Sequence, residues 1–312
     1  MILILDADGV FLSERPYWES ALRTAWKQLG FVELHRAEFK KLAAIAFETV
    51  GLQWVAKKRG CNSNWDLTAV LERSLFSSDK RDPVDQRFRL GQFETGLQSW
   101  KRASEQLGEE TSETGDPLIQ FGISRNSRQF SNVVARFQLE YEVVESQLES
   151  TEITLGRPAS LAATLDALPS PPRICTGRPR SELESALAKA QIDRRFDLER
   201  SITCSDIAQE LGKPHPYPLL RCLFEESEVD EWLVTKANLP RCEETVVYVG
   251  DSLSDLLAAQ AASDLGLTMR YLHRSSDSTT EDVLQRLNLS SCSSGLINTL
   301  ADLPDWLREN CK

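Results

Sequence analysis

Short, continuous runs of apolar residues recur near both ends of the chain. Residues 2–5 read Ile-Leu-Ile-Leu, and residues 245–249 (Thr-Val-Val-Tyr-Val) are almost entirely β-branched or aromatic. A shorter run covers 173–175, a weaker one 201–204, and another 267–272. Runs of this length, bounded by polar residues, proline or glycine, are typical of strands buried on both faces of a parallel sheet. We therefore predict strands at these positions.

Helical periodicity fills the segments between these runs. Helices are predicted at 160–168, 180–190 and 253–262. Strands that alternate with helices of this length indicate right-handed crossovers between parallel neighbours. The pattern predicts an α/β fold whose core is a Rossmann-like, doubly wound parallel sheet.

The segment 16–149 has a different pattern, with helical spacing of apolar residues and few strand-like runs. The predicted helical windows are 17–29, 36–58, 65–76, 83–107 and 129–148. Residues 108–116 are polar and acidic, which predicts an exposed loop. We expect an α-helical cap domain at 16–149, inserted into an α/β core domain made of 1–15 and 150–312.

The composition supports a two-domain globular protein. Of 312 residues, 41% are apolar and 27% are charged. The seven cysteines form no C-x-x-C pair, so we expect reduced thiols in a cytoplasmic protein, without a zinc framework. The five apolar residues at the start are too few for a signal peptide, and no run approaches the roughly 18 residues of a membrane span. No membrane partner is expected.

The net charge limits the kinds of partner. The chain carries 36 basic and 47 acidic side chains, for a net charge of −11. Binding to a nucleic-acid backbone needs a surplus of lysine and arginine, so no nucleic-acid partner is expected. A small phosphorylated metabolite remains compatible, because a local cluster of positive groups outweighs the global field at short range.

Two short polar motifs directly follow predicted strands. Asp6 and Asp8 come after the first strand, in the segment Asp-Ala-Asp-Gly-Val. Thr176, Gly177 and Arg178 come after the second. Ligands bind beyond the carboxyl ends of the strands in open parallel sheets. A threonine hydroxyl and nearby backbone N–H groups bind phosphate oxygens, and carboxylates at the end of a buried strand need a partner.

Two further motifs complete the set. Lys213 lies in the segment Gly-Lys-Pro-His-Pro, whose prolines stiffen the loop that carries this point charge. Asp251 and Asp255 follow the strand at 245–249, where Ser252 is placed to cap a helix that starts at residue 253. Taken alone, each motif also fits an ordinary role, such as a solvated acidic turn, a Thr-Gly turn or a surface lysine.

Together, in this order, the four motifs resemble those of the haloacid dehalogenase-like superfamily of phosphohydrolases. The resemblance covers residues 1–15 and about 150–312. The helical insert resembles the α-helical cap of the phosphoglycolate phosphatase-like subgroup, although at 16–149 it is enlarged. In that family the cap selects the substrate.

The resemblance implies roles for individual residues. Asp6 would be the nucleophile that forms an aspartyl-phosphate, and Asp8 the general acid and base. Thr176, Gly177 and Lys213 would bind the transferring phosphoryl group. Mg²⁺ would be held by Asp6, the backbone carbonyl of Asp8, and Asp251, with Asp255 as a ligand or behind the ligands. Arg178 would be a second positive group for the substrate, or equally a salt-bridge partner on the following helix.

The expected function is therefore a magnesium-dependent phosphatase, a phosphoric monoester hydrolase that acts on a small phosphomonoester. Two alternatives stay open at this point. A phosphomutase has the same core, and no feature of the sequence separates it from a phosphatase. A non-enzymatic adaptor or regulatory protein derived from the fold is the other, although such chains tend to lose the catalytic carboxylates.

Overall fold

The computed structural model describes most of the chain: residues 1–28, 35–46, 64–76, 98, 118, 123–235, 239, 241–274 and 293–311. The chain divides into two compact units. Unit 1 consists of Met1–Glu14 and Glu149–Lys312, and unit 2 of Arg15–Leu148. Each unit has a hydrophobic core of its own.

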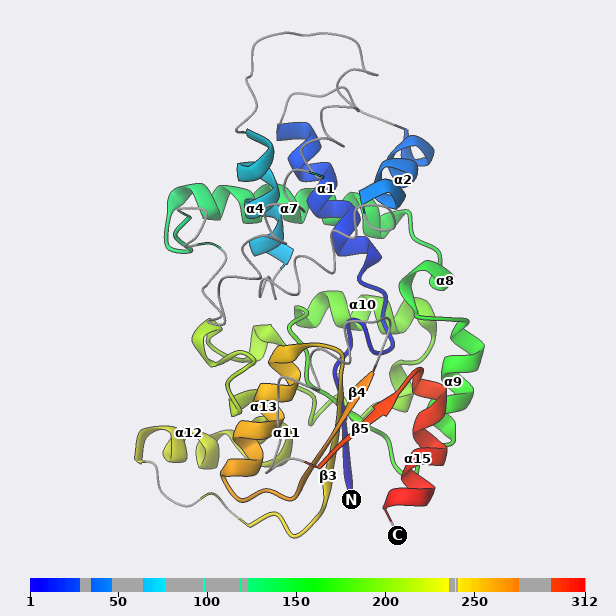
Figure 1. Cartoon of the computed structure of the whole chain (residues 1–312), viewed down its shortest axis with the longest axis vertical. Helices are drawn as coiled ribbons and strands as arrows, with labels where there is room; N and C mark the ends of the chain where they lie inside the picture. The colour runs from blue at the N-terminus through cyan, green and yellow to red at the C-terminus, as the bar shows by residue number, and fades with distance from the viewer. Residues whose placement is uncertain are drawn as a thin grey trace, which may run out of the picture. The chain divides into compact units, whose positions relative to one another are not determined.

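The described part of unit 1 contains a five-stranded, fully parallel sheet in the order β2-β1-β3-β4-β5 (Figure 1). The strands are β1 (Ile2–Leu5), β2 (Arg173–Ile174), β3 (Val246–Gly250), β4 (Met269–Arg274) and β5 (Ser293–Ile297). The predicted α/β, Rossmann-like parallel sheet is confirmed.

The register of the three strands that carry motifs sets the position of the site. Leu5 at the end of β1 lies between Ile174 of β2 and Val249 of β3. The ladder continues for one more residue on each side, because the Asp6 N–H donates to the Val249 carbonyl (2.8 Å) and the Cys175 N–H to the Leu5 carbonyl (2.9 Å). The residues that follow β1, β2 and β3 therefore leave the sheet at the same edge.

Helices cover both faces of the sheet. The helices of unit 1 are α8 (Ser150–Ile153), α9 (Pro158–Asp166), α10 (Arg180–Ala190), α11 (Tyr217–Leu223), α12 (Glu226–Thr235), α13 (Leu253–Asp264) and α15 (Leu303–Asn310). Short 3₁₀ turns lie at Asp193–Arg195, Cys204–Asp206, Gln209–Leu211 and Leu300–Asp302. Figure 1 shows α11, α12 and α13 on one side of the sheet, and α9 and α15 on the other.

Alternate strand residues account for this two-sided packing. Ile4, Tyr248 and Tyr271 share a buried core with α11 and α13. Leu3 and Leu5, whose side chains point the opposite way along β1, are also buried. Complete burial of such a side chain contributes about 2 kcal/mol relative to leaving it exposed, so the short β1 is held mainly by apolar packing.

Three parts of unit 1 differ from the predicted elements. Residues 201–204 are not a strand, because the Ser201 hydroxyl, not a backbone carbonyl, accepts the Ile174 N–H (2.8 Å) and only Ile202 forms a bridge, with Cys175. The strand predicted at 267–272 begins two residues later, as β4. Strand β5 and helices α11, α12 and α15 were not predicted.

All the regular elements described in unit 2 are helices. Its helices are α1 (Arg15–Gln28), α2 (Arg36–Ala44), α4 (Asn64–Phe76) and α7 (Arg128–Ser146). Helix α1 packs against both α4 and α7, and the Tyr17 ring stacks on Tyr141 with 4.8 Å between centroids. Beneath this contact, Glu140 accepts a hydrogen bond from Arg23 (3.2 Å). The core of the unit is thus built from α1 facing α7.

These helices match the predicted windows to within one or two residues where both are described; in the window 36–58, α2 is followed by a π-helical turn at 45–46. Helix α1 starts earlier than predicted because proline is accommodated in a first helical turn, where its missing N–H has no partner to lose. Residues 47–58, almost all of the window 83–107 and the loop 108–116 lie outside the described residues. Every described helix is too short or too polar to span a bilayer.

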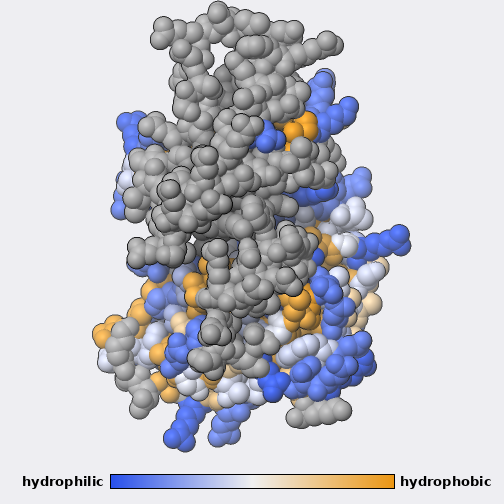
Figure 2. All heavy atoms as spheres, in the orientation of Figure 1, coloured by the Kyte–Doolittle hydropathy of each residue, from blue (hydrophilic) through white to orange (hydrophobic). Residues whose placement is uncertain are grey.

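Large apolar side chains on the described surface are scattered. Those most exposed are Met1, Leu139, Val143, Val234, Leu265 and Leu296. Figure 2 shows hydrophilic residues interspersed with smaller apolar areas on the visible part of the described surface. Leu139 and Val143 lie one turn apart on α7, whereas the other four are separate from one another in the chain, as is normal for exposed apolar residues of a folded protein.

Candidate active site

Asp6 occupies the first position after β1 and is almost fully buried, with 6% of its surface exposed. Its Oδ1 accepts a hydrogen bond from the Ala7 N–H (2.8 Å) and lies 3.0 Å from Lys213 Nζ. The chain then turns back sharply, since the Leu12 N–H donates to the Ala7 carbonyl (2.9 Å). Gly9 lies in this turn with a φ of +74°, which favours glycine.

Gly9 also brings the loops after β1 and β3 into contact. A Cβ atom on Gly9 would lie 1.9 Å from Asp251 Oδ2, so no larger residue fits while Asp251 keeps this position. On the other side of the turn, Arg274 Nη1 at the end of β4 donates to the Gly9 carbonyl (2.7 Å). The first loop is therefore fixed by contacts from two other strands.

The loop after β3 leads directly into α13. Ser252 caps the helix, because its hydroxyl accepts the Asp255 N–H (3.3 Å) while Asp255 Oδ2 accepts the Ser252 N–H (3.1 Å). The predicted cap is confirmed. A Cβ atom on Gly250 would lie 2.4 Å from Asp255 Cβ, so a glycine is needed at the end of β3. This reciprocal cap places Asp255 beneath the strand end.

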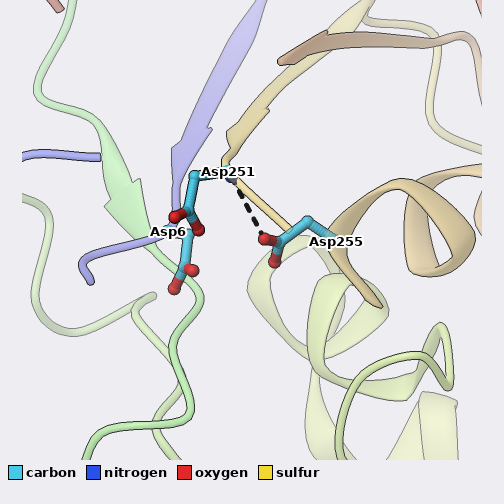
Figure 3. Close-up of side chains that lie close together, drawn as sticks. All are labelled: Asp6, Asp251 and Asp255. Atoms are coloured by element: carbon cyan, nitrogen blue, oxygen red, sulfur yellow. Dashed lines mark hydrogen bonds between the residues drawn. The ribbon is translucent and has the colours of Figure 1, made fainter. Parts of the chain in front are cut away.

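Three carboxylates converge here. Figure 3 shows Asp6 after β1, Asp251 after β3 and Asp255 in the first turn of α13, and one oxygen from each lies within 4.8 Å of the others. Carboxylates at this distance repel one another, and a hard divalent cation removes the repulsion. Asp6 and Asp251, with Asp255 beside them, therefore fit a metal ion. Asp8, the other carboxylate of the first motif, is not part of this group.

Lys213 connects this group to a buried tyrosine. Its Nζ lies 2.6 Å from Asp255 Oδ1 and 3.3 Å from both the Cys175 carbonyl and the Tyr248 hydroxyl. The Tyr248 hydroxyl donates to the same Asp255 oxygen (2.5 Å). Lys213 thus stands between Asp6 and Asp255, in a network whose members come from β3, α13 and the loop before α11.

Burial and neighbouring charges shift the pKa values of the ionisable groups in this network. Burial raises the pKa of Asp6 well above its ordinary value; Lys213 opposes this shift, and the neighbouring carboxylates add to it. Burial also disfavours ionised Asp255, but Lys213 and hydrogen bonds from Ser252 and Tyr248 hold its pKa below the ordinary value. Burial lowers the pKa of Lys213, yet Asp255 and Asp6 outweigh it and raise this pKa well above normal. Lys213 and Asp255 therefore form a charged pair.

The Thr-Gly-Arg motif lies beside the first loop. Thr176 is buried, and its Oγ1 accepts the Arg178 N–H (3.2 Å). Gly177 is exposed, with open space where a Cβ atom would stand. The Arg178 guanidinium contacts both oxygens of Asp8, through Nη2 to Oδ1 and through Nε to Oδ2 (3.4 Å). Arg178 is therefore tied to Asp8.

The structure gathers all the predicted site residues at the carboxyl edge of the sheet. Asp6, Lys213 and Asp255 are in direct contact, and Asp251 adjoins them. Asp8 connects to Thr176 through Arg178.

Two residues of the site were not singled out from the sequence, Tyr248 and Arg274. The signal for Tyr248 is its place in an otherwise aliphatic strand, because a buried tyrosine hydroxyl needs a hydrogen-bond partner.

Among the comparisons with known proteins, solved structures are similar to this chain. No protein-family model matches the chain, and no curated protein matches its sequence. A solved structure, target ZR25 of the Northeast Structural Genomics Consortium, matches at a TM-score of 0.61 and 19% identity over 99% of this chain and 98% of that one.

Two further structures match almost completely in length. A hydrolase from Pseudomonas syringae matches at a TM-score of 0.49 and 16% identity, over 99% of this chain and 98% of its own. A conserved haloacid dehalogenase-like protein of unknown function from Agrobacterium tumefaciens matches at 0.46 and 14%, over 100% and 99%. At identities this low, the likeness is one of fold alone.

The sheet order, the helical unit inserted after β1 and the four motifs at the carboxyl edge agree with the resemblance found in the sequence. The observed architecture is therefore the α/β core with an inserted helical unit that this resemblance implies. The phosphoglycolate phosphatase-like subgroup stays a prediction.

Proposed function

We propose that this protein is a magnesium-dependent phosphohydrolase that forms an aspartyl-phosphate on Asp6. One observation carries the proposal: the buried Asp6 carboxylate lies 3.0 Å from Lys213 Nζ and within 4.8 Å of carboxylate oxygens of Asp251 and Asp255. A nucleophilic carboxylate, a cation that attracts a phosphate and a group able to hold a metal thus meet at one point.

Asp6 attacks the phosphorus atom of the ester, and the bond from phosphorus to the ester oxygen breaks. Protonated Asp8 gives its proton to the leaving oxygen, which departs as an alcohol. In the second step, ionised Asp8 takes a proton from water as the water attacks the aspartyl-phosphate. Inorganic phosphate leaves, and Asp6 is regenerated. Lys213, Thr176 and Gly177 bind the oxygens of the transferring phosphoryl group throughout.

The metal would be held by Asp6, Asp251 and the backbone carbonyl of Asp8. When bound, Mg²⁺ neutralises the phosphoryl charge and orients the ester for attack. Asp255 supports the site from behind, because both of its oxygens already accept hydrogen bonds, from Lys213, Tyr248 and Ser252. These contacts fix Lys213 beside Asp6 before substrate binds.

The substrate that we propose is a small phosphomonoester. A net charge of −11 disfavours a long polyanion, which a basic surface would have to follow. Among the residues that the structure describes, few positive groups lie at the site, and Lys213 is enclosed. This arrangement suits one phosphate group on a compact molecule.

A screen of phosphorylated metabolites, read as phosphate released, tests the proposal. We expect turnover of at least one small ester with Mg²⁺, loss of turnover in excess EDTA, and restoration by Mg²⁺ but poorly by Ca²⁺, whose longer bonds and higher coordination number suit the site less. Asp6→Asn should lower the rate by at least roughly 1,000-fold. Full activity in chelator, or activity only on phosphopeptides or oligonucleotides, would contradict the proposal.

A further inference from the structure

We propose that Arg178 is a positioning residue for Asp8, holding its carboxyl group in the orientation needed for proton exchange with the leaving oxygen. The inference rests on the proposed function and assigns a role to a residue that neither binds phosphate nor transfers a proton. It follows from the contacts, burial and anchoring of the Arg178 side chain.

The contact between the two side chains restricts rotation of the Asp8 carboxyl. Arg178 donates from Nη2 to Oδ1 and from Nε to Oδ2 (3.4 Å), so both oxygens are held by one planar group. A guanidinium that binds both oxygens of a carboxylate defines the plane of that carboxylate as well as its position. A lysine at the same place would supply the charge without defining the plane.

The side chains of Arg178 and Asp8 differ in solvent exposure. The Arg178 side chain is 2% exposed, whereas that of Asp8 is 20% exposed. The arginine is therefore enclosed by protein and fixed in place, while the carboxyl that it holds still reaches solvent. This is the arrangement expected of a rigid support behind a group that must exchange protons with substrate and water.

The backbone of Arg178 is anchored to the phosphate-binding motif. Its N–H donates to Thr176 Oγ1 (3.2 Å), and α10 begins only two residues later, after Pro179. Arg178 and Asp8 are 170 residues apart in the chain. The contact thus aligns the group that protonates the leaving oxygen with the segment that we propose binds the phosphoryl oxygens. A carboxyl free to rotate would meet the leaving oxygen in the productive geometry for a smaller fraction of the time.

Dependence on the leaving group separates this role from a purely structural one. The test uses a series of phenyl phosphates, from 4-nitrophenyl to 4-methoxyphenyl, whose leaving phenols become progressively weaker acids. Proton donation matters least for the first ester and most for the last. In Arg178→Gln we expect kcat/KM to fall by roughly threefold for the 4-nitrophenyl ester and by roughly 100-fold for the 4-methoxyphenyl ester. Arg178→Lys should give an intermediate slope and is the variant measured if Arg178→Gln does not fold.

Arg180→Gln is the matched control. Arg180 is two residues further along and forms an ion pair with Asp206 (2.6 Å), away from the carboxylates of the site. Its loss should leave the ratio between the esters unchanged. In an Asp8→Asn background, Arg178→Gln should cause no further change in that ratio, because the group that it positions no longer carries a proton to give.

Each result has a distinct meaning. A steep dependence on the leaving group in the Arg178 variants, absent in the Asp8→Asn background, supports the inference. An equal loss for every ester, or a ratio that still changes in the Asp8→Asn background, overturns it while the proposed function stands. Failure of the unsubstituted enzyme to release phosphate from any of the esters or from any metabolite of the screen would overturn the proposed function and the inference together.

Discussion

The loops after β1 and β3 invite comparison, since each contains two carboxylates: Asp6 and Asp8 in one, Asp251 and Asp255 in the other. In each loop, the second carboxylate forms an ion pair with a basic side chain from a distant part of the sequence. The two pairs differ in the solvent exposure of their side chains, and we infer different roles from this difference.

The ion pair of Lys213 and Asp255 near the end of β3 is buried. Asp255 has no exposed side-chain surface, and its oxygens accept hydrogen bonds from Lys213, Tyr248, Ser252 and the Asp251 N–H. A carboxylate so fully satisfied has little capacity left for a ligand or a proton. We infer that its task is to hold Lys213 in place and to begin α13.

The pair at the β1 end is open on one side. The Asp8 side chain is 20% exposed, and its cation, Arg178, is the buried partner. The two pairs therefore differ: at β3 both the acid and the base are enclosed, whereas at β1 the base is enclosed and the acid is partly exposed. Only the acid at β1 is accessible for proton transfer.

The largest effect on catalysis that tests this contrast is expected for Asp8→Asn. Phosphate release from phenyl phosphate should fall by roughly 100- to 1,000-fold per folded molecule, because the leaving oxygen no longer receives a proton. Asp193→Asn, at an exposed acidic position in a 3₁₀ turn, should be neutral. A variant at Asp8 that retains more than a tenth of the activity would remove the distinction between the two loops.

The next effect concerns stability. Asp255→Ala leaves Lys213 and the Tyr248 hydroxyl buried without their shared partner, so the free energy of unfolding should fall by about 3 kcal/mol. Asp264→Ala, at the exposed end of the same helix, should change it by less than about 0.5 kcal/mol. Urea unfolding followed by circular dichroism gives both values. Equal small changes in the two variants would show that Asp255 does not support the network.

The smallest expected effect comes from one hydroxyl. Tyr248→Phe removes the hydrogen bond to the Asp255 carboxylate and should lower the free energy of unfolding by about 1–2 kcal/mol, since bonds to charged groups are the stronger ones. Tyr271→Phe on the neighbouring strand removes weaker, neutral bonds to Ser252 and His273 and should cost about half as much. The reverse order would contradict a charged pair of Lys213 and Asp255.

How far the fold could be predicted depended on local signals. Strands β1 and β3 were found because they are unbroken apolar runs, and α13 because a helical pattern follows β3 and Ser252 is placed to cap it. Strand β5 (Ser-Ser-Gly-Leu-Ile) lacks such a run and is defined by its pairing with β4. The candidate strand at 201–204 was wrong because a serine hydroxyl replaced the backbone acceptor there.

The residues of the site likewise fall into those that could be predicted from the sequence and those that could not. Asp6, Asp8, Asp251, Asp255 and Thr176 stand in short motifs that follow strand ends, so their convergence could be predicted from parallel strands sharing one edge. Lys213 stands in the loop before α11, which no described strand directly precedes. The partners of Asp8 and Asp255 could not be predicted. Arg178 is 170 residues from Asp8, and Tyr248 reaches Asp255 only because both side chains turn to the same side of the sheet edge. Such contacts depend on side-chain direction in the folded chain, which no spacing encodes.

The central claim is that Asp6 carries the phosphoryl group, and chemical trapping tests it most directly. The protein is mixed with Mg²⁺ and 4-nitrophenyl phosphate, quenched in acid during turnover and treated with borohydride, which reduces an aspartyl-phosphate to homoserine. Peptide mass spectrometry then locates the reduced residue. We predict homoserine at position 6 in the active protein and none in Asp8→Asn that was never exposed to the ester. Turnover with Asp6 unmodified, or with another carboxylate reduced in its place, would contradict the mechanism.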